Sequence, residues 1–147
     1  MPILVKDVMT KNVVTLDSSD YVKKAAEYMA KYDIGCLIVM KDGRPEGIVT
    51  ERDMLKRVLL QFRDPRLTRV EDIMSTPLMA SSVETELSEA MRLMNERRIK
   101  KLPVVDNDHL IGLLTLTDVV RSVGYLEHVI TSMCSRCRLK NLSEITP

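Results

Sequence analysis

The sequence predicts a mixed α/β (α+β) fold made of two copies of one strand-helix-strand-strand-helix unit. The pattern Gly-x-x-Thr-x-x-Asp occurs twice, from Gly47 to Asp53 and from Gly112 to Asp118. The two copies are 65 residues apart, and most of the chain matches itself without a gap when it is shifted by that distance. Helical and extended apolar patterns also follow one another in the same order in both copies. The repeat therefore concerns a whole supersecondary unit rather than one short motif.

The length of 147 residues suits one domain, or two halves of about 60 residues that share a core. Each half alone would be marginally stable, so we expect the two to pack together. We divide the chain into a first unit (1–62), a linker (63–69), a second unit (70–124) and a C-terminal helix or tail (125–147).

In the first unit, a short apolar segment follows the polar break at 10–12, and the polar run 17–20 offers N-cap side chains for a helix over 21–32. The apolar run 36–40 predicts a strand, and Asp42-Gly43 predicts a tight hairpin turn to a partner strand that ends at Thr50. Apolar residues at helical spacing follow from Met54.

The second unit repeats this order after a charged linker that contains Pro65. Thr76-Pro77 indicates an extended chain, because proline disfavours the helical conformation in the residue before it. We expect a short strand there, then a helix around 87–94, a hairpin around 106–108 and a last helix around 119–123.

Charge and composition argue against several classes of protein. The chain carries 22 basic and 21 acidic residues, whereas proteins that wrap nucleic acid are strongly basic. No stretch approaches the roughly 20 apolar residues of a membrane span, and no secretory signal is visible. Three cysteines, an odd number, do not make a secreted disulfide framework. We expect a cytoplasmic protein with no membrane association, and we do not favour nucleic acid as a partner.

Two gap-free copies of this unit resemble a tandem pair of CBS domains, the module named after cystathionine beta-synthase. The resemblance covers about residues 5–123 and includes Asp-x-Met-Thr/Ser near the start of each copy and the run from Lys100 to Asp106. It implies two motifs packed through their sheets with pseudo-twofold symmetry, and homodimers of such pairs. It also implies adenine nucleotides (AMP, ADP or ATP) in two clefts between the motifs, with no required cofactor and no enzymatic activity.

The Thr-x-x-Asp part of each repeat has two interpretations. Threonine followed three residues later by an acid, where a strand gives way to a helix, is typical of a capping box. In the family, the aspartate accepts hydrogen bonds from ribose hydroxyls, and the threonine hydroxyl lies near phosphate. A carboxylate suits two vicinal hydroxyls because it only accepts hydrogen bonds. One pair of residues could serve both purposes.

The resemblance also implies the remaining site residues. Lys100 and Lys101 occupy positions from which relatives reach phosphates, although a solvated basic turn explains them equally well. The first copy has Gly35 and Cys36 there, so the two clefts should differ in charge, and we favour the one that ends in Asp118. The full set of predicted ligand-binding residues is Thr10, Lys11, Asn12, Val13, Cys36, Thr50, Arg52, Asp53, Thr76, Pro77, Leu78, Lys100, Lys101, Thr115, Thr117 and Asp118.

No aromatic residue is available to stack on a base in the loops 10–14 and 75–79. Adenine would therefore be held by backbone groups and by aliphatic walls. We expect these walls to be Ile34, Val39, Ile99 and Val104, for which plain hydrophobic core is the alternative.

Cys134 and Cys137 form a Cys-x-x-Cys pair outside the resemblance and are weak metal candidates. A zinc ribbon needs four ligands, usually two such pairs, and only one pair exists.

The sequence thus predicts a regulatory module that binds an adenine nucleotide and signals its occupancy to an unknown protein partner. Three alternatives stay open: a sensor of an S-adenosyl compound, a nucleic-acid-binding regulator that uses the basic tail at Arg136, Arg138 and Lys140, and a passive dimerisation scaffold.

Overall fold

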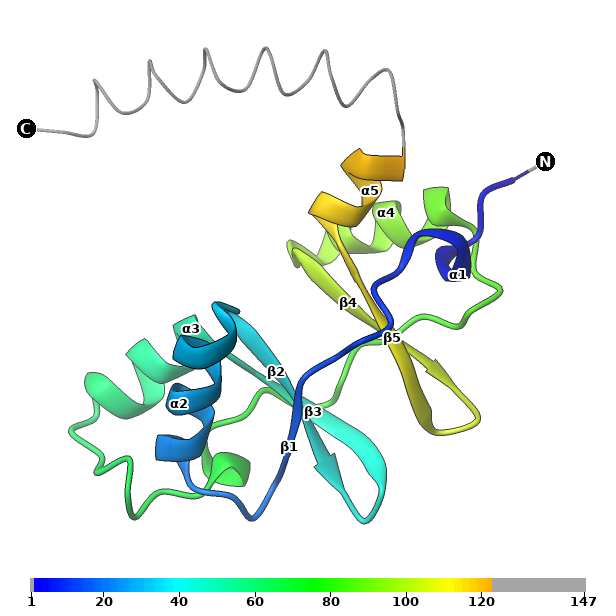
Figure 1. Cartoon of the computed structure of the whole chain (residues 1–147). Coiled ribbons are helices and arrows are strands. Elements are labelled where there is room, and N and C mark those ends of the chain that lie inside the picture. Colours follow the sequence, from blue (N-terminus) through cyan, green and yellow to red (C-terminus); the bar gives the residue numbers. More distant parts are fainter. Residues whose placement is uncertain (1, 123–147) are drawn as a thin grey trace, which may run out of the picture.

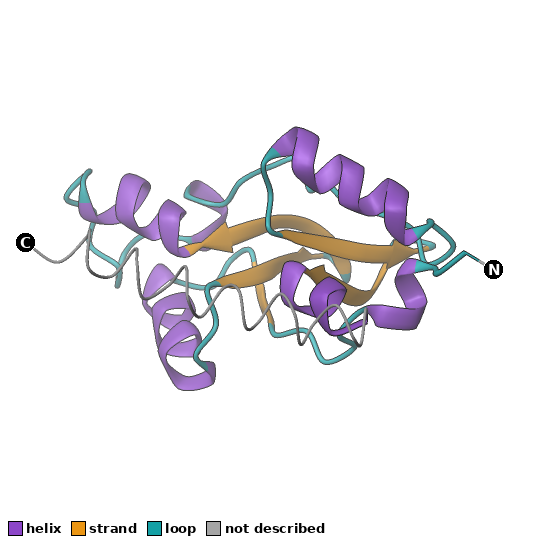
Figure 2. Cartoon of the chain, turned by 90° about the horizontal axis from the view of Figure 1, so that it is seen from above, coloured by secondary structure: helices purple, strands orange, loops and turns teal. Residues whose placement is uncertain are grey.

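A computed structural model describes residues 2–122 and contains both predicted units (Figure 1). The strands lie between the helices of the two units (Figure 2). No helix in residues 2–122 has both the length and the apolar character that crossing a membrane requires. In chain order the elements are α1 (Val5–Val8), β1 (Thr15–Asp17), α2 (Val22–Tyr32), β2 (Cys36–Lys41), β3 (Arg44–Thr50), α3 (Glu51–Asp53), the π-helical segment η1 (Met54–Leu59), the 3-10 turn η2 (Val70–Asp72), α4 (Leu87–Arg97), β4 (Lys101–Asp106), β5 (His109–Thr115) and α5 (Leu116–Ser122).

The first unit holds a three-stranded sheet in the order β1-β2-β3. β1 runs parallel to β2, with α2 as the crossover, and β2 pairs antiparallel with β3. Leu37 and Val39 belong to the core that α2 covers, whereas Cys36 and Ile38 point to the other face. All four side chains are buried. The central strand is thus covered on both faces, which explains why its sequence is continuously apolar.

The second unit keeps the β4-β5 hairpin, but its sheet has two strands instead of three. The short strand expected after Pro77 is wrong: only one parallel bridge forms there, between Ser81 and Val104. The equivalent bridge in the first unit joins Leu16 to Val39 within a regular strand. Leu16 is 4% exposed and belongs to the core, whereas a serine in its place brings no apolar surface to stabilise an edge strand.

Both hairpins confirm the turn predictions. Asp42 and Gly43 adopt positive φ, as do Asn107 and Asp108 in the second unit, which matches the tight hairpin turn that such residues favour. A register shift follows Val39 in one hairpin and Val104 in the other. The repeat therefore extends to the irregularities of the strands.

The segments that open the two units are exchanged. Val5 of α1 is fully buried in the core of the second unit, and Val70 of η2 is fully buried in the core of the first. Figure 1 shows α1 lying beside the second unit, near α5. Each opening segment then crosses a strand of the unit that receives it, through bridges from Thr10 to Leu113 and from Ser75 to Ile48. Each core is consequently completed by residues of the other half.

The prediction of a polar side-chain N-cap for the first long helix is wrong. Tyr21 is the N-cap residue of α2, and its side chain makes no capping hydrogen bond. Instead, the first helical N–H groups, of Val22 and Lys23, donate to the carbonyl oxygens of Thr68 and Pro65 at 2.9 Å each. The linker caps this helix because its backbone runs along the start of α2.

The crossings explain why both copies of the repeated motif begin with glycine, at Gly47 and Gly112. A Cβ atom at Gly112 would lie 2.8 Å from the carbonyl oxygen of Thr10, and one at Gly47 would lie 2.9 Å from that of Ser75. Such distances are too short for a carbon and an oxygen that are not bonded. Only glycine lets the exchanged segment come this close to the strand.

We predict that Gly112→Ala lowers the free energy of unfolding by about 1–3 kcal/mol, because the backbone of the crossing segment must move away. Urea denaturation measures the change. Gly35→Ala is the matched control, since no atom would lie closer than 3.4 Å to its Cβ, and the nearest atoms belong to the side chains of Glu51 and Lys101. A Gly112→Ala protein that is as stable as the wild type would contradict this steric explanation.

Candidate ligand-binding clefts

Two clefts lie between the units, at positions related by the internal repeat. The cleft at the end of β3, which we name the large cleft, has a volume of about 740 Å³. The cleft at the end of β5, the small cleft, has a volume of about 200 Å³. Each combines the end of one hairpin, an exchanged opening segment and the start of the central strand of the other hairpin. The exchange of opening segments therefore builds both clefts.

Most of the predicted ligand-binding residues line one cleft or both. Those in the large cleft are Cys36, Thr50, Arg52, Pro77, Leu78, Lys100 and Lys101. Those in the small cleft are Thr10, Asn12, Val13, Cys36, Lys101 and Thr115. Five of the predicted residues line neither cavity: Lys11, Asp53, Thr76, Thr117 and Asp118.

The Thr-x-x-Asp pairs form capping boxes in both copies. The N–H of Asp53 donates to Thr50 Oγ1 at 3.2 Å, and the N–H of Thr50 donates to Asp53 Oδ2 at 2.9 Å. The corresponding bonds between Asp118 and Thr115 measure 3.1 and 3.0 Å. The capping interpretation is confirmed. It does not close the sites, because Thr50 and Thr115 also line the clefts.

Each aspartate lies behind its threonine and is tied to the exchanged segment. Asp53 is 7% exposed and its Oδ1 accepts a hydrogen bond from Ser75 Oγ at 3.0 Å. Asp118 is 9% exposed and its Oδ1 accepts one from Thr10 Oγ1 at 3.0 Å. Ser75 and Thr10 are equivalent positions of the repeat. The carboxylates thus hold the opening segments of both units against the helix starts.

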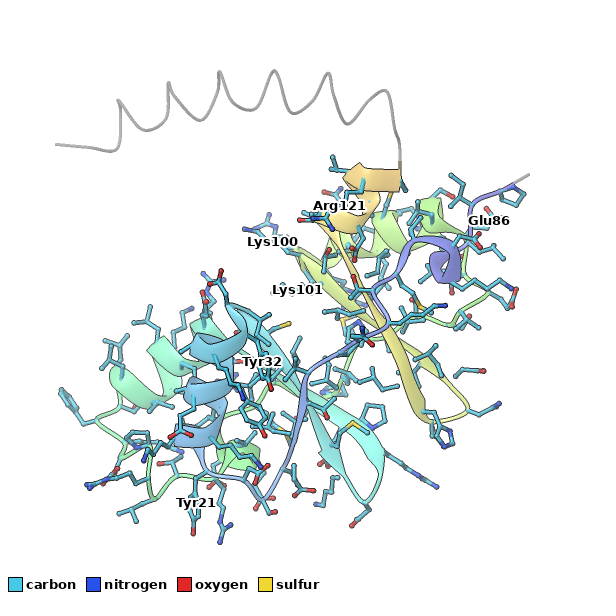
Figure 3. The ribbon with its side chains drawn as sticks, in the orientation of Figure 1. Tyr21, Tyr32, Glu86, Lys100, Lys101 and Arg121 are labelled. Carbon is cyan, nitrogen blue, oxygen red and sulfur yellow. The ribbon has the colours of Figure 1, made fainter. Side chains whose placement is uncertain are left out.

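The basic residues gather in the large cleft. Arg52, Arg98, Lys100 and Lys101 line it together with one acid, Glu51. Figure 3 shows Lys100 and Lys101 projecting from the start of β4 toward the first unit. The expectation that both lysines belong with the cleft of Asp118 is therefore wrong for Lys100, which lines only the cleft of Thr50, whereas Lys101 lines both clefts. The reason is that the start of each central strand faces the opposite hairpin.

Sequence reasoning missed Arg98 as a residue of the cleft. Arg98 ends α4 in the left-handed conformation, with φ of 54°, and this turn of the backbone brings the chain to the cavity. The basic run around it was visible in the sequence, but it fits a solvated helix end equally well.

The aliphatic walls are partly as expected. Ile34 lines the small cleft and Ile99 the large one. The expectation is wrong for Val39 and Val104, because both belong to the hydrophobic cores under the helices. Side chains alternate between the two faces of a strand, so Val39, three positions after the cleft residue Cys36, lies on the opposite face. Ile38, one position before Val39, lines the small cleft instead.

Arg57 was also missed, and the sequence gives no signal for it. Its guanidinium donates to the carbonyl oxygens of Ile73 and Met74 at 3.0 and 2.8 Å, and its Nε lies 3.9 Å from Asp53 Oδ1. Arg57 therefore connects η1 to the backbone that leads into the segment 75–79 of the large cleft.

Metal-binding groups do not occur in the described part of the chain: residues 2–122 bring together no three side chains of histidine, cysteine, aspartate or glutamate. The weak candidates Cys134 and Cys137 lie outside the described residues. Cys36 is a buried free cysteine, and burial raises the pKa of its thiol, an effect that the nearby Lys101 ammonium partly offsets. The thiol is therefore uncharged at neutral pH.

These features define a tandem-repeat module with two clefts at equivalent positions of the repeat. The CBS domain model matches residues 5–60 and 70–125, so the chain belongs to the CBS domain family and carries a tandem pair of these domains.

Known proteins with the same module span a range of sizes. The chain is 35% identical over 115 residues to the CBS domain-containing protein YhcV of Bacillus subtilis, covering 78% of this chain and 81% of that one. It is 35% identical over 136 residues to the mitochondrial protein CBSX3 of Arabidopsis thaliana, covering 84% and 66%. The solved structure of CBSX2 in complex with AMP has a TM-score of 0.74 at 28% identity, covering 85% and 98%.

We predict that Asp53→Ala lowers the free energy of unfolding by about 2–3 kcal/mol, because the hydroxyl of Ser75 and the N–H of Thr50 both lose their acceptor. Chemical denaturation provides the measurement. Glu89→Ala, an exposed change in α4, serves as the control and should stay within about 0.5 kcal/mol. Equal effects of the two substitutions would show that the buried carboxylate does not hold the segment.

Proposed function

We propose that this CBS pair is a regulatory ligand sensor, and that the large cleft is its principal site for an adenine nucleotide. The observation that carries this proposal is a cleft of about 740 Å³ that four basic side chains line. Ligand sites in proteins commonly measure about 300–1,000 Å³. The small cleft, at about 200 Å³, falls below that range.

The phosphate end of the nucleotide would lie against Arg52, Arg98, Lys100 and Lys101. Charged donors suit phosphate because their hydrogen bonds to an anion are about twice as strong as neutral ones. The base would lie between apolar groups of the same cleft, Ile48, Ile99 and Leu78. Basic and aliphatic side chains that line the same cleft suit a ligand with a charged tail and a flat apolar ring.

Relatives support this assignment. CBSX2 has been solved in complex with AMP and is similar to this chain over 85% of its length. The chain also matches 23% of the length of an inosine-5'-monophosphate dehydrogenase from Methanocaldococcus jannaschii. The same pair thus occurs both alone and as a minor part of an enzyme, which favours binding over catalysis as its role here.

Signalling would begin at Asp53, the carboxylate behind the large cleft. A ribose hydroxyl that reached Asp53 Oδ1 would replace the hydroxyl of Ser75, and so release the segment 75–79 from the start of α3. Arg57 holds the backbone just before this segment, at Ile73 and Met74, so movement of the segment would be passed to η1. A ligand shifts such an equilibrium only by its differential affinity for the two states. We propose a homodimer of CBS pairs and a separate protein partner as the receivers of this change.

We predict that Lys100→Met weakens AMP binding about tenfold, as expected for the loss of one charge-assisted hydrogen bond. Calorimetry with AMP, ADP, ATP and S-adenosylmethionine is the measurement. Binding of S-adenosylmethionine should not change, because it has no phosphate. Lys41→Met, on the exposed hairpin, is the matched control. If no nucleotide binds the wild type, the proposal fails; if only S-adenosylmethionine binds, the sensor is of that class.

A further inference from the structure

We propose that the two clefts compete for one ammonium group, that of Lys101, so that a phosphate-bearing ligand in one cleft weakens anion binding in the other. The inference rests on the proposed function, because it requires that the large cleft binds a nucleotide. It goes further by assigning a coupling between the clefts to a single side chain.

Lys101 and Cys36 occupy equivalent positions of the repeat, each at the first residue of a central strand. Each of them lines both clefts. Cys36 pairs with Thr50 in its hairpin and Lys101 pairs with Thr115, so the two stand where the ends of the hairpins meet. They therefore form the wall between the two cavities.

The position of the Lys101 ammonium fits a shared group. Nζ lies 3.5 Å from the point where a Cβ on Gly35 would stand, on the side of the large cleft. Lys101 also lines the small cleft, together with Cys36. The side chain is half-buried, and a lysine stem has four rotatable carbons. Rotation about this stem would direct its head group to one cavity or the other.

The two clefts depend on this group to different degrees. The large cleft has three further basic residues, Arg52, Arg98 and Lys100. Among the described residues that line the small cleft, Lys101 is the only basic one. Cys36, which stands where a second lysine would complete the symmetry, carries no charge at neutral pH, because burial raises the pKa of its thiol.

In this proposal, the Lys101 ammonium turns toward one cavity to contact a phosphate there and so leaves the other cavity. When a nucleotide in the large cleft engages Lys101, the small cleft loses its cation and faces a new negative charge across a thin wall, an interaction that the low dielectric of the interior strengthens. Coupling of this kind is reciprocal: an anion in the small cleft lowers the affinity of the large cleft by the same factor.

Isoleucine methyl groups allow each cleft to be observed separately in the full chain. Ile34 and Ile38 line only the small cleft, whereas Ile48 and Ile99 line only the large one. We would label isoleucine methyls with ¹³C and titrate inorganic phosphate at constant ionic strength, with and without saturating AMP. The signals of Ile48 and Ile99 report AMP, and those of Ile34 and Ile38 report phosphate.

In the wild type, AMP should weaken phosphate binding to the small cleft about tenfold, the effect of losing one charge-assisted hydrogen bond. Lys101→Met should abolish the phosphate response of Ile34 and Ile38 while AMP still binds. Cys36→Lys gives each cleft its own cation, and should reduce the effect of AMP to below about threefold. Lys100→Met is the control: it should weaken AMP but, at saturation, leave its effect on phosphate intact.

Two results would overturn the proposal while leaving the proposed function intact: phosphate affinity at the small cleft that does not respond to AMP, or a small cleft that binds phosphate equally well in Lys101→Met. Absence of any phosphate response at Ile34 and Ile38 in the wild type would overturn it too. Failure of the proposed function gives a different signature, since Ile48 and Ile99 would then show no response to AMP. If Cys36→Lys does not fold, the Lys101→Met and wild-type titrations still decide.

Discussion

The close crossing of each exchanged segment over a strand of the other unit is the constraint on which the rest of the structure depends. The backbone of Thr10 passes over Gly112, and that of Ser75 passes over Gly47, at distances that leave no room for a Cβ atom. Backbone hydrogen bonds fix each crossing, from Thr10 N to Leu113 O and from Ser75 N to Ile48 O. Neither half has a complete core without the other, so folding and cleft formation are parts of one event.

This symmetric framework carries asymmetric chemistry. The repeat places Gly35 opposite Lys100, Cys36 opposite Lys101 and Asp33 opposite Arg98. Because the start of each central strand faces the opposite hairpin, all the basic members of these pairs contribute to the large cleft, and only Lys101 also reaches the small one. A few differences between the copies therefore give one large cleft with four basic side chains and a second, smaller cleft with one. The backbone arrangement of the clefts is the same in both.

The repeat, the hairpins and the long helices could be predicted because each depends on residues close together in sequence. The offset of 65 residues and the Asp-Gly turn are of this kind. The exchange of opening segments could not be predicted from the sequence. The two opening segments are so similar in pattern that either could complete either core, and periodicity does not say which unit receives which segment. That ambiguity explains the misplacement of Lys100. The cap of α2 was wrong for a related reason: its acceptors, such as Thr68 O, come from the linker backbone, which any residue type supplies.

The capping box of Thr50 and Asp53 lies next to the large cleft for a physical reason. A capping box needs an acceptor at the start of a helix, and Asp53 supplies one that binds Thr50 and still has a second oxygen for Ser75. That second bond attaches the segment lining the large cleft to the helix start. Any ligand hydroxyl that competes for the same oxygen therefore acts directly on a contact between the two halves of the chain. Under the proposed function, the groups that stabilise the fold would also be the ones that transmit binding in the cleft.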